Sequence, residues 1–443
     1  MSRFRINDTH AYIYRTHDGG KSWKLINNGL PDFGPVDTVR EDPVRKGLLF
    51  AGTENSIWVS FDDGDHWQSL QLNLPHTSMR DLWIHDNDLI VATHGRSFWI
   101  LDDIAPLREI SSGAVNSAHL FAPAPAYRIQ RDTNTDTPLP PDEPVASNPP
   151  DGAILDYLLA APASSATIEI LNDQNKVVRR YSNTDKPDTS DEELQKQLIP
   201  LYWTRPRRQL SVKSGMHRWV WDLHYTAPVS IRHDYPIAAI PHDTPRYPLG
   251  PNALPGKYTV RLTADGKTSS APLLVKMDPR VKTSNAGLQK KFETESHLAS
   301  IVSESSQALL QGGSIRAQVE KLRSQGQERI KSSVEEFEKK LTALMGAPGG
   351  FFAPPTKEIT VSRVNGEAST LYQEVWQVDA GPTSAQLEAV TAVGRDREDV
   401  MKRWSVFKSA DLPAMNRLLR ESQVPEINIE AEMKQDEPAV DEE

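Results

Sequence analysis

The sequence lacks cysteine altogether across its 443 residues. This absence excludes disulfides, thiolate nucleophiles and metal sites with thiolate ligands. No apolar run approaches the roughly 20 residues that cross a bilayer, so we expect no membrane span. The formal net charge is −10, and the lysines and arginines form no patch or stripe of the kind that binds nucleic acid. Nucleic acid is therefore excluded as an expected partner.

The N-terminus also lacks the apolar core of a secretory signal, because its first eight residues read MSRFRIND. The sequence alone leaves the localisation unknown. At about 150 residues per domain, the length predicts roughly three folded domains.

Charge is uneven along the chain. Residues 430–443 hold seven acidic residues and one lysine, a net −6 that leaves −4 for the rest of the protein. A charged segment with few apolar residues cannot offset the entropy lost on ordering. We therefore predict a disordered acidic tail over residues 426–443.

The strongest signal is an internal repeat near the N-terminus. Residues 16–23 (THDGGKSW) and 60–67 (SFDDGDHW) share the pattern [ST]-x-D-x-G-x-[SH]-W and lie 44 residues apart. In such a box the aspartate accepts hydrogen bonds from nearby backbone N–H groups, and glycine supplies a positive φ. We predict a structural role at a turn, with both tryptophans buried beneath it. The predicted structural residues are Asp18, Gly20, Trp23, Asp62, Gly64 and Trp67.

The repeat spacing matches one four-stranded blade of a β-propeller. A third, decayed copy follows, in which residues 89–92 lie 41 residues after 48–51 and residues 97–100 align with 56–59. In this copy Asp103 replaces the box aspartate, while the glycine and tryptophan are lost. Terminal repeats are often atypical in this way.

The number of blades is too small for a closed ring. Residues 1–30 supply one outer hairpin, residues 33–76 a whole blade and residues 80–104 most of another. Closed rings have at least four blades, and an open ring leaves unpaired strand edges. We therefore expect residues 1–110 to be terminal blades of an incomplete ring, with further blades upstream.

The middle of the chain predicts a linker and then a second β domain. Residues 111–150 are taken as a linker because their later part is rich in proline, aspartate and threonine. Alternating strands with turn signals predict a β-sandwich, Ig/Fn3-like, over residues 151–280. Trp219 and Trp221 alternate on one face of a predicted strand, so both are expected in its core.

Helical periodicity replaces alternation after residue 280 and predicts a helical bundle over residues 281–425. Two antiparallel helices are expected at 286–310 and 315–345, with Gly312-Gly313 as the turn between them. Three more helices are predicted, the second with Thr383 as its cap; they span residues 369–378, 384–408 and 412–421. The fold class is thus mainly β with a C-terminal α region.

Several phrases resemble a large bacterial family of BNR/Asp-box propellers. They are EDP (41–43), VSFDDG (59–64), ATHGRSFWILDD (92–103), PGKYTVRL (255–262) and VKMDPR (275–280). Members of this family are also described as sortilin-like (VPS10-type) propellers or as glycosyl hydrolases. The resemblance implies more blades than are present here, and export to the periplasm or the cell exterior.

The hydrolase description implies particular residues. Sialidases share the Asp-box propeller and use an arginine triad, a Tyr–Glu nucleophile pair and an acidic proton donor. Arg80, Arg96, Tyr12 and Tyr14 are present, but their spacing does not form a diagnostic set.

Other candidate sites are few. His66, His85 and His94 lie at turn or sheet positions without the spacing of metal ligands, so no metal site is predicted. The sequence contains no phosphate-binding loop, so no cofactor is predicted. The turn His94-Gly95-Arg96 is the most distinctive local feature, and His94 and Arg96 are candidate binding residues, with a structural bulge as the alternative. The basic run 205–208 (RPRR) is either an anion-binding segment or a solvated loop.

These observations favour a non-catalytic binding or scaffold region that recognises a protein, peptide or glycan. The alternative is a carbohydrate hydrolase, a sialidase-like glycosidase, whose catalytic residues lie in upstream blades. Fold alone does not decide between the two.

Overall fold

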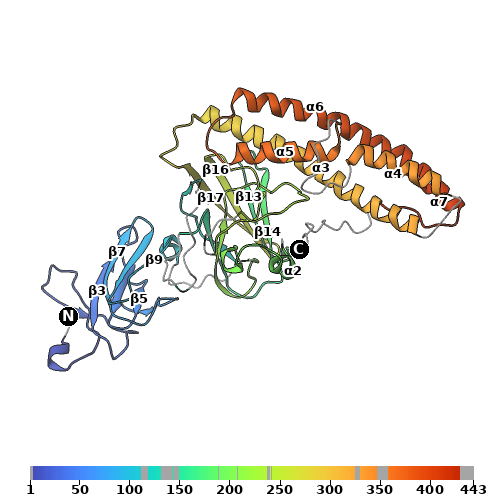
Figure 1. The fold of residues 1–443 in the computed structure, drawn as a ribbon. Coiled ribbons are helices and arrows are strands. Elements are labelled where there is room, and N and C mark those ends of the chain that lie inside the picture. Colours follow the sequence, from blue (N-terminus) through green and yellow to red (C-terminus); the bar gives the residue numbers. More distant parts are fainter. Residues whose placement is uncertain are drawn as a thin grey trace.

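The computed structural model describes residues 3–110, 118–130, 142, 149–187, 189–206, 208–236, 240, 242–324, 330–346 and 358–429. Five β-sheets are followed by helices along the chain. Figure 1 shows them in that order along an elongated molecule, with the helices extending away from the sheets. The expected order of a β-rich region and a C-terminal α region is confirmed.

The first three sheets are antiparallel and follow one another in sequence. We call residues 11–30 unit A, residues 36–76 unit B and residues 79–104 unit C. Their sheets have two, four and three strands, in the orders β1-β2, β3-β4-β5-β6 and β7-β8-β9. The strands are β1 Tyr14–Arg15, β2 Lys24–Leu25, β3 Val36–Glu41, β4 Leu49–Thr53, β5 Ile57–Ser60, β6 Gln68–Ser69, β7 Met79–His85, β8 Asp88–Thr93 and β9 Phe98–Leu101.

Unit B is buried on both faces, because a separate apolar cluster fills each of its two interfaces. The cluster between units A and B comprises Ala11, Ile13, Ile26, Val36, Leu49, Ala51 and Trp67. The cluster between units B and C comprises Leu48, Phe50, Ile57, Val59, Leu70, Met79, Leu82, Leu89, Val91 and Ile104. The short helix α1 (Ala105–Glu109) follows unit C.

Two further sheets form the middle of the chain and share one buried cluster. Their orders are β10-β12-β15 and β11-β17-β16-β13-β14. The strands are β10 His119–Leu120, β11 Ala126–Arg128, β12 Ala153–Leu159, β13 Ala166–Leu171, β14 Val177–Ser182, β15 Gly215–Trp221, β16 Gly256–Ala264 and β17 Lys267–Met277, and the helix α2 spans Asp191–Gln195. Trp221 is fully buried as expected, whereas Trp219 is only partly buried and packs against Tyr181.

Two of these strands correct the predicted linker. β10 pairs with β12, and β11 pairs in parallel with β17, so residues 119–128 belong to the two sheets. The linker was assigned from the composition of residues 131–150, which does not represent the residues before 130. Except for positions 142, 149 and 150, that proline-rich segment lies outside the described residues.

The helices are α3 Asn285–Ser324, α4 Lys331–Met345, α5 Val361–Trp376, α6 Ser384–Val406 and α7 Leu412–Glu421. The turn predicted at Gly312-Gly313 is wrong, because α3 runs unbroken through both glycines. Gly312 lies against Met345 of α4, so a small residue is needed where the two helices meet. The α5 helix begins earlier than predicted, at a cap where Thr360 accepts a hydrogen bond from the Arg363 N–H (3.3 Å).

The helix predicted over residues 315–345 is wrong at its start, because α4 begins at Lys331. The start of α6, in contrast, follows the sequence signal closely. Thr383 caps α6 with a full capping box that includes Gln386. A single π-helical turn, Phe407–Asp411, joins α6 to α7, whose second residue is Pro413. Proline lacks the N–H that a continuous α-helix would use, which accounts for the irregular turn.

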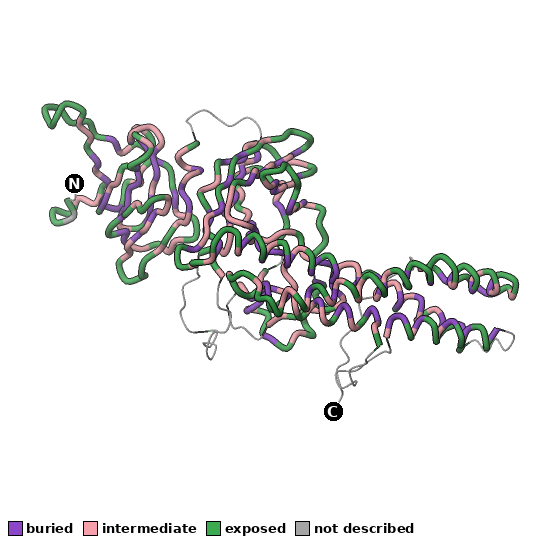
Figure 2. Tube along the Cα trace, turned by 90° about the horizontal axis from the view of Figure 1, so that it is seen from above, coloured by how far each residue is buried: buried purple, intermediate pink, exposed green. Residues whose placement is uncertain are grey.

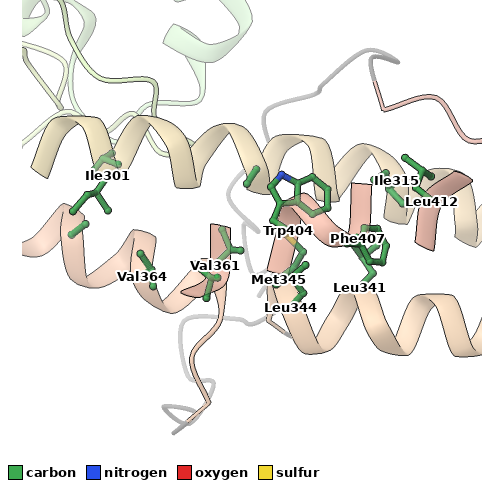
Figure 3. Close-up of a cluster of buried hydrophobic side chains, with 14 of the residues drawn as sticks. Ile301, Ile315, Leu341, Leu344, Met345, Val361, Val364, Trp404, Phe407 and Leu412 are labelled. Carbon is green, nitrogen blue, oxygen red and sulfur yellow. The ribbon is translucent and has the colours of Figure 1, made fainter. Parts of the chain in front are cut away.

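The helical core is continuous from α3 to α7. Figure 3 shows Ile301 and Ile315 of α3 with Leu341 of α4 and Trp404 of α6 in this cluster. Ile427 is also buried in it, so the predicted disordered tail is wrong for residues 426–429. Residues 430–443 lie outside the described part of the chain. Figure 2 shows buried residues inside the sheets and along the facing sides of the helices.

A buried ionic network joins the middle sheets to the helices. Arg128 of β11 pairs with Asp379 (2.5 Å), which also lies 3.7 Å from the Nζ of Lys291 in α3. Lys291 pairs in turn with Glu295 (2.6 Å), whose carboxylate accepts hydrogen bonds from the backbone and side chain of Asn252. Buried charges are tolerated when they are paired in this way.

Candidate functional site

The two box turns have the same hydrogen-bond network. In the first, Asp18 accepts bonds from the backbone N–H of Ser22 (2.9 Å) and the hydroxyl of Thr16 (2.9 Å). In the second, Asp62 accepts from the backbone N–H of His66 and the hydroxyl of Ser60 at the same two distances. The Ser22 hydroxyl also donates to Asp18 (2.7 Å), and this bond, with those from the Ser22 N–H and the Thr16 hydroxyl, holds the pKa of Asp18 down at about 2. Both aspartates are thus occupied by their own turns, as expected of structural residues.

The box tryptophans differ in their surroundings. Trp67 is 5% exposed, and its Nε1 donates to the carbonyl of Ile26 in unit A (2.9 Å). Trp23 is 60% exposed, and its Nε1 donates to Gly20 within its own turn (3.1 Å). The expected burial is confirmed for Trp67 and wrong for Trp23. Trp67 is buried because apolar residues of unit A and of β4 pack around its ring. We call these surrounding residues the seat of Trp67.

A polar cluster lies where the first strands of units B and C begin. Both strands carry a β-bulge, and the extra residues are Asp37 in β3 and Arg80 in β7, 43 positions apart. Arg80 Nη1 lies 3.5 Å from Asp37 Oδ1 and Arg80 Nη2 lies 3.7 Å from Glu54 Oε2. Bulges commonly redirect side chains near functional sites. We call Asp37, Glu54, Ser78 and Arg80 the strand-start cluster.

The buried hydroxyl of Ser78 lies between the two carboxylates of this cluster. It is 3.1 Å from Asp37 Oδ2 and 3.1 Å from Glu54 Oε2. One hydroxyl can donate only one proton at a time, so one carboxylate always lacks this bond. Burial raises the pKa of Asp37, and the neighbouring Glu54 charge adds to the rise, while Ser78 and Arg80 oppose it. The cluster can therefore hold a proton or accept hydrogen bonds from a ligand.

The turn that carries the candidate binding residues His94 and Arg96 is joined to this cluster at His94. Both residues belong to the turn between β8 and β9. The Thr93 hydroxyl donates to the Ser97 carbonyl across this turn, whereas in unit B the Thr53 hydroxyl donates to the Ser56 carbonyl. The turn in unit C is therefore one residue longer. The His94 N–H donates to the Ser78 carbonyl (2.9 Å), which ties the turn to the cluster. Both side chains are exposed and make no hydrogen bond or ion pair within the part of the chain that the structure describes.

The remaining sequence candidates are occupied elsewhere. Tyr12 donates its hydroxyl hydrogen bond to Asp8 (3.0 Å), and Arg205 of the basic run pairs with Asp243 (2.7 Å). Arg80 is the one member of the sialidase-type set that joins the strand-start cluster. Among the described residues, no group of three histidines or acidic residues could hold a metal, and no helix is long and apolar enough to cross a membrane.

Sequence reasoning missed Asp37, Glu54 and Ser78. A signal was available, because Asp37 and Arg80 occupy matching positions in consecutive repeats and are both charged. Their pairing, however, depends on two bulges, which leave no reliable mark in a single sequence.

No protein-family model matches the chain. The vacuolar protein sorting/targeting proteins 10 of Pyrenophora teres f. teres (strain 0-1) and Pyrenophora tritici-repentis (strain Pt-1C-BFP) are each 30% identical to it over 76 residues. That stretch is 17% of this chain and 5% of either relative, so the chain spans about a twentieth of their length. Two structures of the extracellular domain of BT4673 from B. thetaiotaomicron align at 11% identity with a TM-score of 0.18, covering 61% of this chain and 29% of theirs. A short part of this protein is thus similar to fungal vacuolar sorting proteins.

Proposed function

We propose that this chain is a binding region of a larger sortilin-like Asp-box propeller protein and that it recognises a protein or peptide. The main support is the strand-start cluster, whose hydrogen-bond acceptors adjoin the turn that carries the exposed His94 and Arg96. The similarity to proteins whose name describes sorting and targeting supports a protein ligand. Sheets of two, four and three strands at the repeat spacing support the blade interpretation of units A to C.

The chemistry of the site suits a peptide with charged or polar groups. Asp37 and Glu54 can accept hydrogen bonds from an ammonium, a guanidinium or a backbone N–H, and charge-assisted bonds of this kind are the stronger ones. Arg96 can form a bidentate pair of hydrogen bonds with a carboxylate. A ligand with groups of both signs would therefore use both sides of the site.

Binding can be tested by selecting displayed random peptides on the full chain and measuring their affinities by calorimetry. We expect micromolar ligands whose affinity falls about tenfold, or about 1.4 kcal/mol, in Arg96→Ala and in Asp37→Asn. Arg420→Ala, at an exposed position of α7, serves as the matched control. Ligands that bind both site variants as tightly as the unaltered protein would contradict this location.

Glycoside hydrolysis is a second candidate, favoured by one observation. The pKa of Asp37 is raised, and the Ser78 hydroxyl lies between Asp37 and a second carboxylate, Glu54. Glycosidases use a carboxyl group of raised pKa as general acid together with a second carboxylate. Turnover of fluorogenic glycosides, including a sialoside, would be expected to fall by about 100-fold or more in Asp37→Asn. No turnover by the full chain, or turnover unchanged in the variant, would eliminate this candidate.

A further inference from the structure

Within the part of the chain that the structure describes, no strand pairs with unit C on the side where unit B has its fourth strand. In unit B, β6 pairs with β5 through Trp58 and Val59. The matching strand of unit C, β9, is the last strand of its sheet. The face of unit C that bears Phe98 and Ile100 is also uncovered, since these side chains are 73% and 56% exposed, whereas Ile57 and Val59 of unit B are buried against unit C.

The backbone of β9 is oriented to accept another strand. In an antiparallel sheet, alternate residues direct both backbone groups to one neighbour. Ile57 directs its carbonyl to Leu70 of the β6 side (3.0 Å). By the same alternation, Phe98 and Ile100 direct their N–H and carbonyl groups away from β8, toward the open edge. Such an edge is a template for strand addition.

The seat of Trp67 shows what a fourth strand brings to an interface. Besides the indole bond to Ile26, the backbone N–H of Trp67 donates to the Asn28 carbonyl (2.9 Å). The ring belongs to the same buried cluster as Leu49 and Ala51. The tryptophan that begins the fourth strand of unit B is thus inserted against the end of unit A.

The equivalent position between units B and C is a cleft that no side chain of the described residues fills. Its walls include the repeat counterparts of the residues around Trp67. In the strand pairing, Leu89, Val91 and Trp99 take the positions of Leu49, Ala51 and Trp58. This corrects the expected alignment of residues 89–92 with 48–51 by one residue, because the β8–β9 turn is one residue longer; Leu70 takes the position of Ile26. All of its lining residues are apolar except Asn73. The cavity volume is about 40 Å³, several times what one water requires. One edge of an indole ring can enter this cavity, and the rest of the ring would lie over Leu72 and Ile100.

Unit C does not provide this tryptophan through a box of its own. After β9 the chain passes through Asp103 into α1, where Arg108 pairs with the buried Asp42 (2.9 Å) and so fixes the direction of the chain. The exposed tryptophans of a second copy, Trp23 and Trp83, lie next to or within strands that are already paired. These positions favour a segment of another protein as the occupant.

We propose that the β9 edge and this cleft bind an extended segment of a partner protein with the pattern Trp-x-x-Leu. The pattern is that of residues 67–70, in which the tryptophan fills the seat and the Leu70 N–H donates to the Ile57 carbonyl. The partner strand pairs with Phe98 and Ile100 while its tryptophan enters the cleft. This inference rests on the proposed protein-binding function and adds a second, apolar recognition element to it.

The test uses a fluorescein-labelled peptide of residues 66–72, HWQSLQL, and its alanine counterpart HAQSLQL, titrated with the full chain. Fluorescence anisotropy should give binding that is at least about tenfold weaker for the alanine peptide. Ile100→Pro should abolish binding, because it removes an outward N–H while leaving the β8 ladder intact. Val44→Ala, at an exposed apolar position away from the cleft, should bind normally.

Three outcomes would overturn the proposal. They are equal affinity for the two peptides, unchanged affinity in a folded Ile100→Pro variant, and self-association that Ile100→Pro abolishes, since the last assigns the edge to a second copy. Leu70→Phe, which fills the cleft from its own wall, provides an independent variant and should also lose binding. Arg96→Ala should bind HWQSLQL normally, so failure of this site and failure of the strand-start cluster are distinguishable.

Discussion

Local sequences that share one motif acquire different roles according to the residues around them. The two box turns have the same internal bonds, yet only Trp67 is inserted between neighbouring units. The box aspartate therefore stabilises its turn in both copies, whereas the tryptophan contributes to packing between units only where a seat exists. The same distinction separates Asp62, bound within its turn, from Asp37, which is free to meet Arg80.

Replacement of Trp67 by alanine should lower the free energy of unfolding by about 3–5 kcal/mol, because it removes a large buried side chain and leaves a cavity. Trp23→Ala is the matched control in the same motif, and it should cost less than about 1 kcal/mol because the ring is exposed. Urea denaturation followed by circular dichroism measures both. Equal losses in the two variants would contradict the packing role assigned to Trp67.

The first box turn should respond to acid in a defined range. A carboxyl whose pKa is lowered by folding contributes stability above its unfolded value, and this contribution is lost as the pH falls toward the folded value. For Asp18 the folded pKa is about 2, so the turn should loosen between about pH 4 and pH 2. The amide proton shift of Ser22, which donates to Asp18, should titrate in this range and not in Asp18→Asn. A midpoint near pH 4 would show that the turn does not bind the carboxylate.

Helix boundaries depend on packing as well as on local propensity. Two consecutive glycines in a helix cost about 1 kcal/mol each relative to alanine, yet α3 continues through them. Gly312 faces Met345, whereas an added Cβ at Gly313 would meet no heavy atom within 4 Å. The first glycine is explained by this close approach, and the structure offers no reason for the second.

Gly313→Ala should stabilise the protein by about 0.5–1 kcal/mol, because alanine loses less backbone entropy in a helix. Gly312→Ala should be less stable than Gly313→Ala by about 1–3 kcal/mol, the usual cost of overpacking. In the first position the new Cβ would lie 2.7 Å from Met345 Sδ. Thermal denaturation of the two variants compares them directly, and equal stability would indicate that the two helices do not meet there.

At the scale of the whole molecule, the middle sheets and the helices are joined by buried charges. The network around Asp379 unites β11, the segment at Asn252 and α3. Trp376 of α5 adds an indole bond to the Gly250 carbonyl (3.0 Å). We therefore propose that residues 118–429 unfold as one cooperative body.

Arg128→Met should lower the free energy of unfolding by about 3–5 kcal/mol, because it leaves the Asp379 carboxylate buried with a weaker partner. Arg420→Met, which removes an exposed pair with Glu426, is the control and should cost at most about 0.5 kcal/mol. A loss below about 1 kcal/mol for Arg128→Met would show that the network does not couple the two parts.

Domain organisation remains a prediction that proteolysis can test. The first cleavage is expected within residues 131–150, and residues 118–130 should stay bound to residues 151–429, because β10 pairs with β12 and β11 pairs with β17. Units A to C expressed alone should exchange their amide hydrogens faster than the middle sheets and the helices do. The exposed side chains of Trp23 and Phe98 show that the outer surfaces of units A and C are not covered by a neighbouring unit. Strong, uniform protection of residues 11–104 in a monomer would contradict this view.

The sequence by itself determined the features that arise from neighbours along the chain: the two box turns, the spacing of the sheets, the Thr383 cap and the change from alternation to helical periodicity. Each depends on hydrogen bonds or patterns within a few residues or within one repeat. Only the tertiary structure decided which tryptophan is buried, why α3 passes through Gly312, and that Asp37 meets Arg80. These outcomes depend on what lies across an interface, because burial and charge pairing are set by segments that are distant in the sequence.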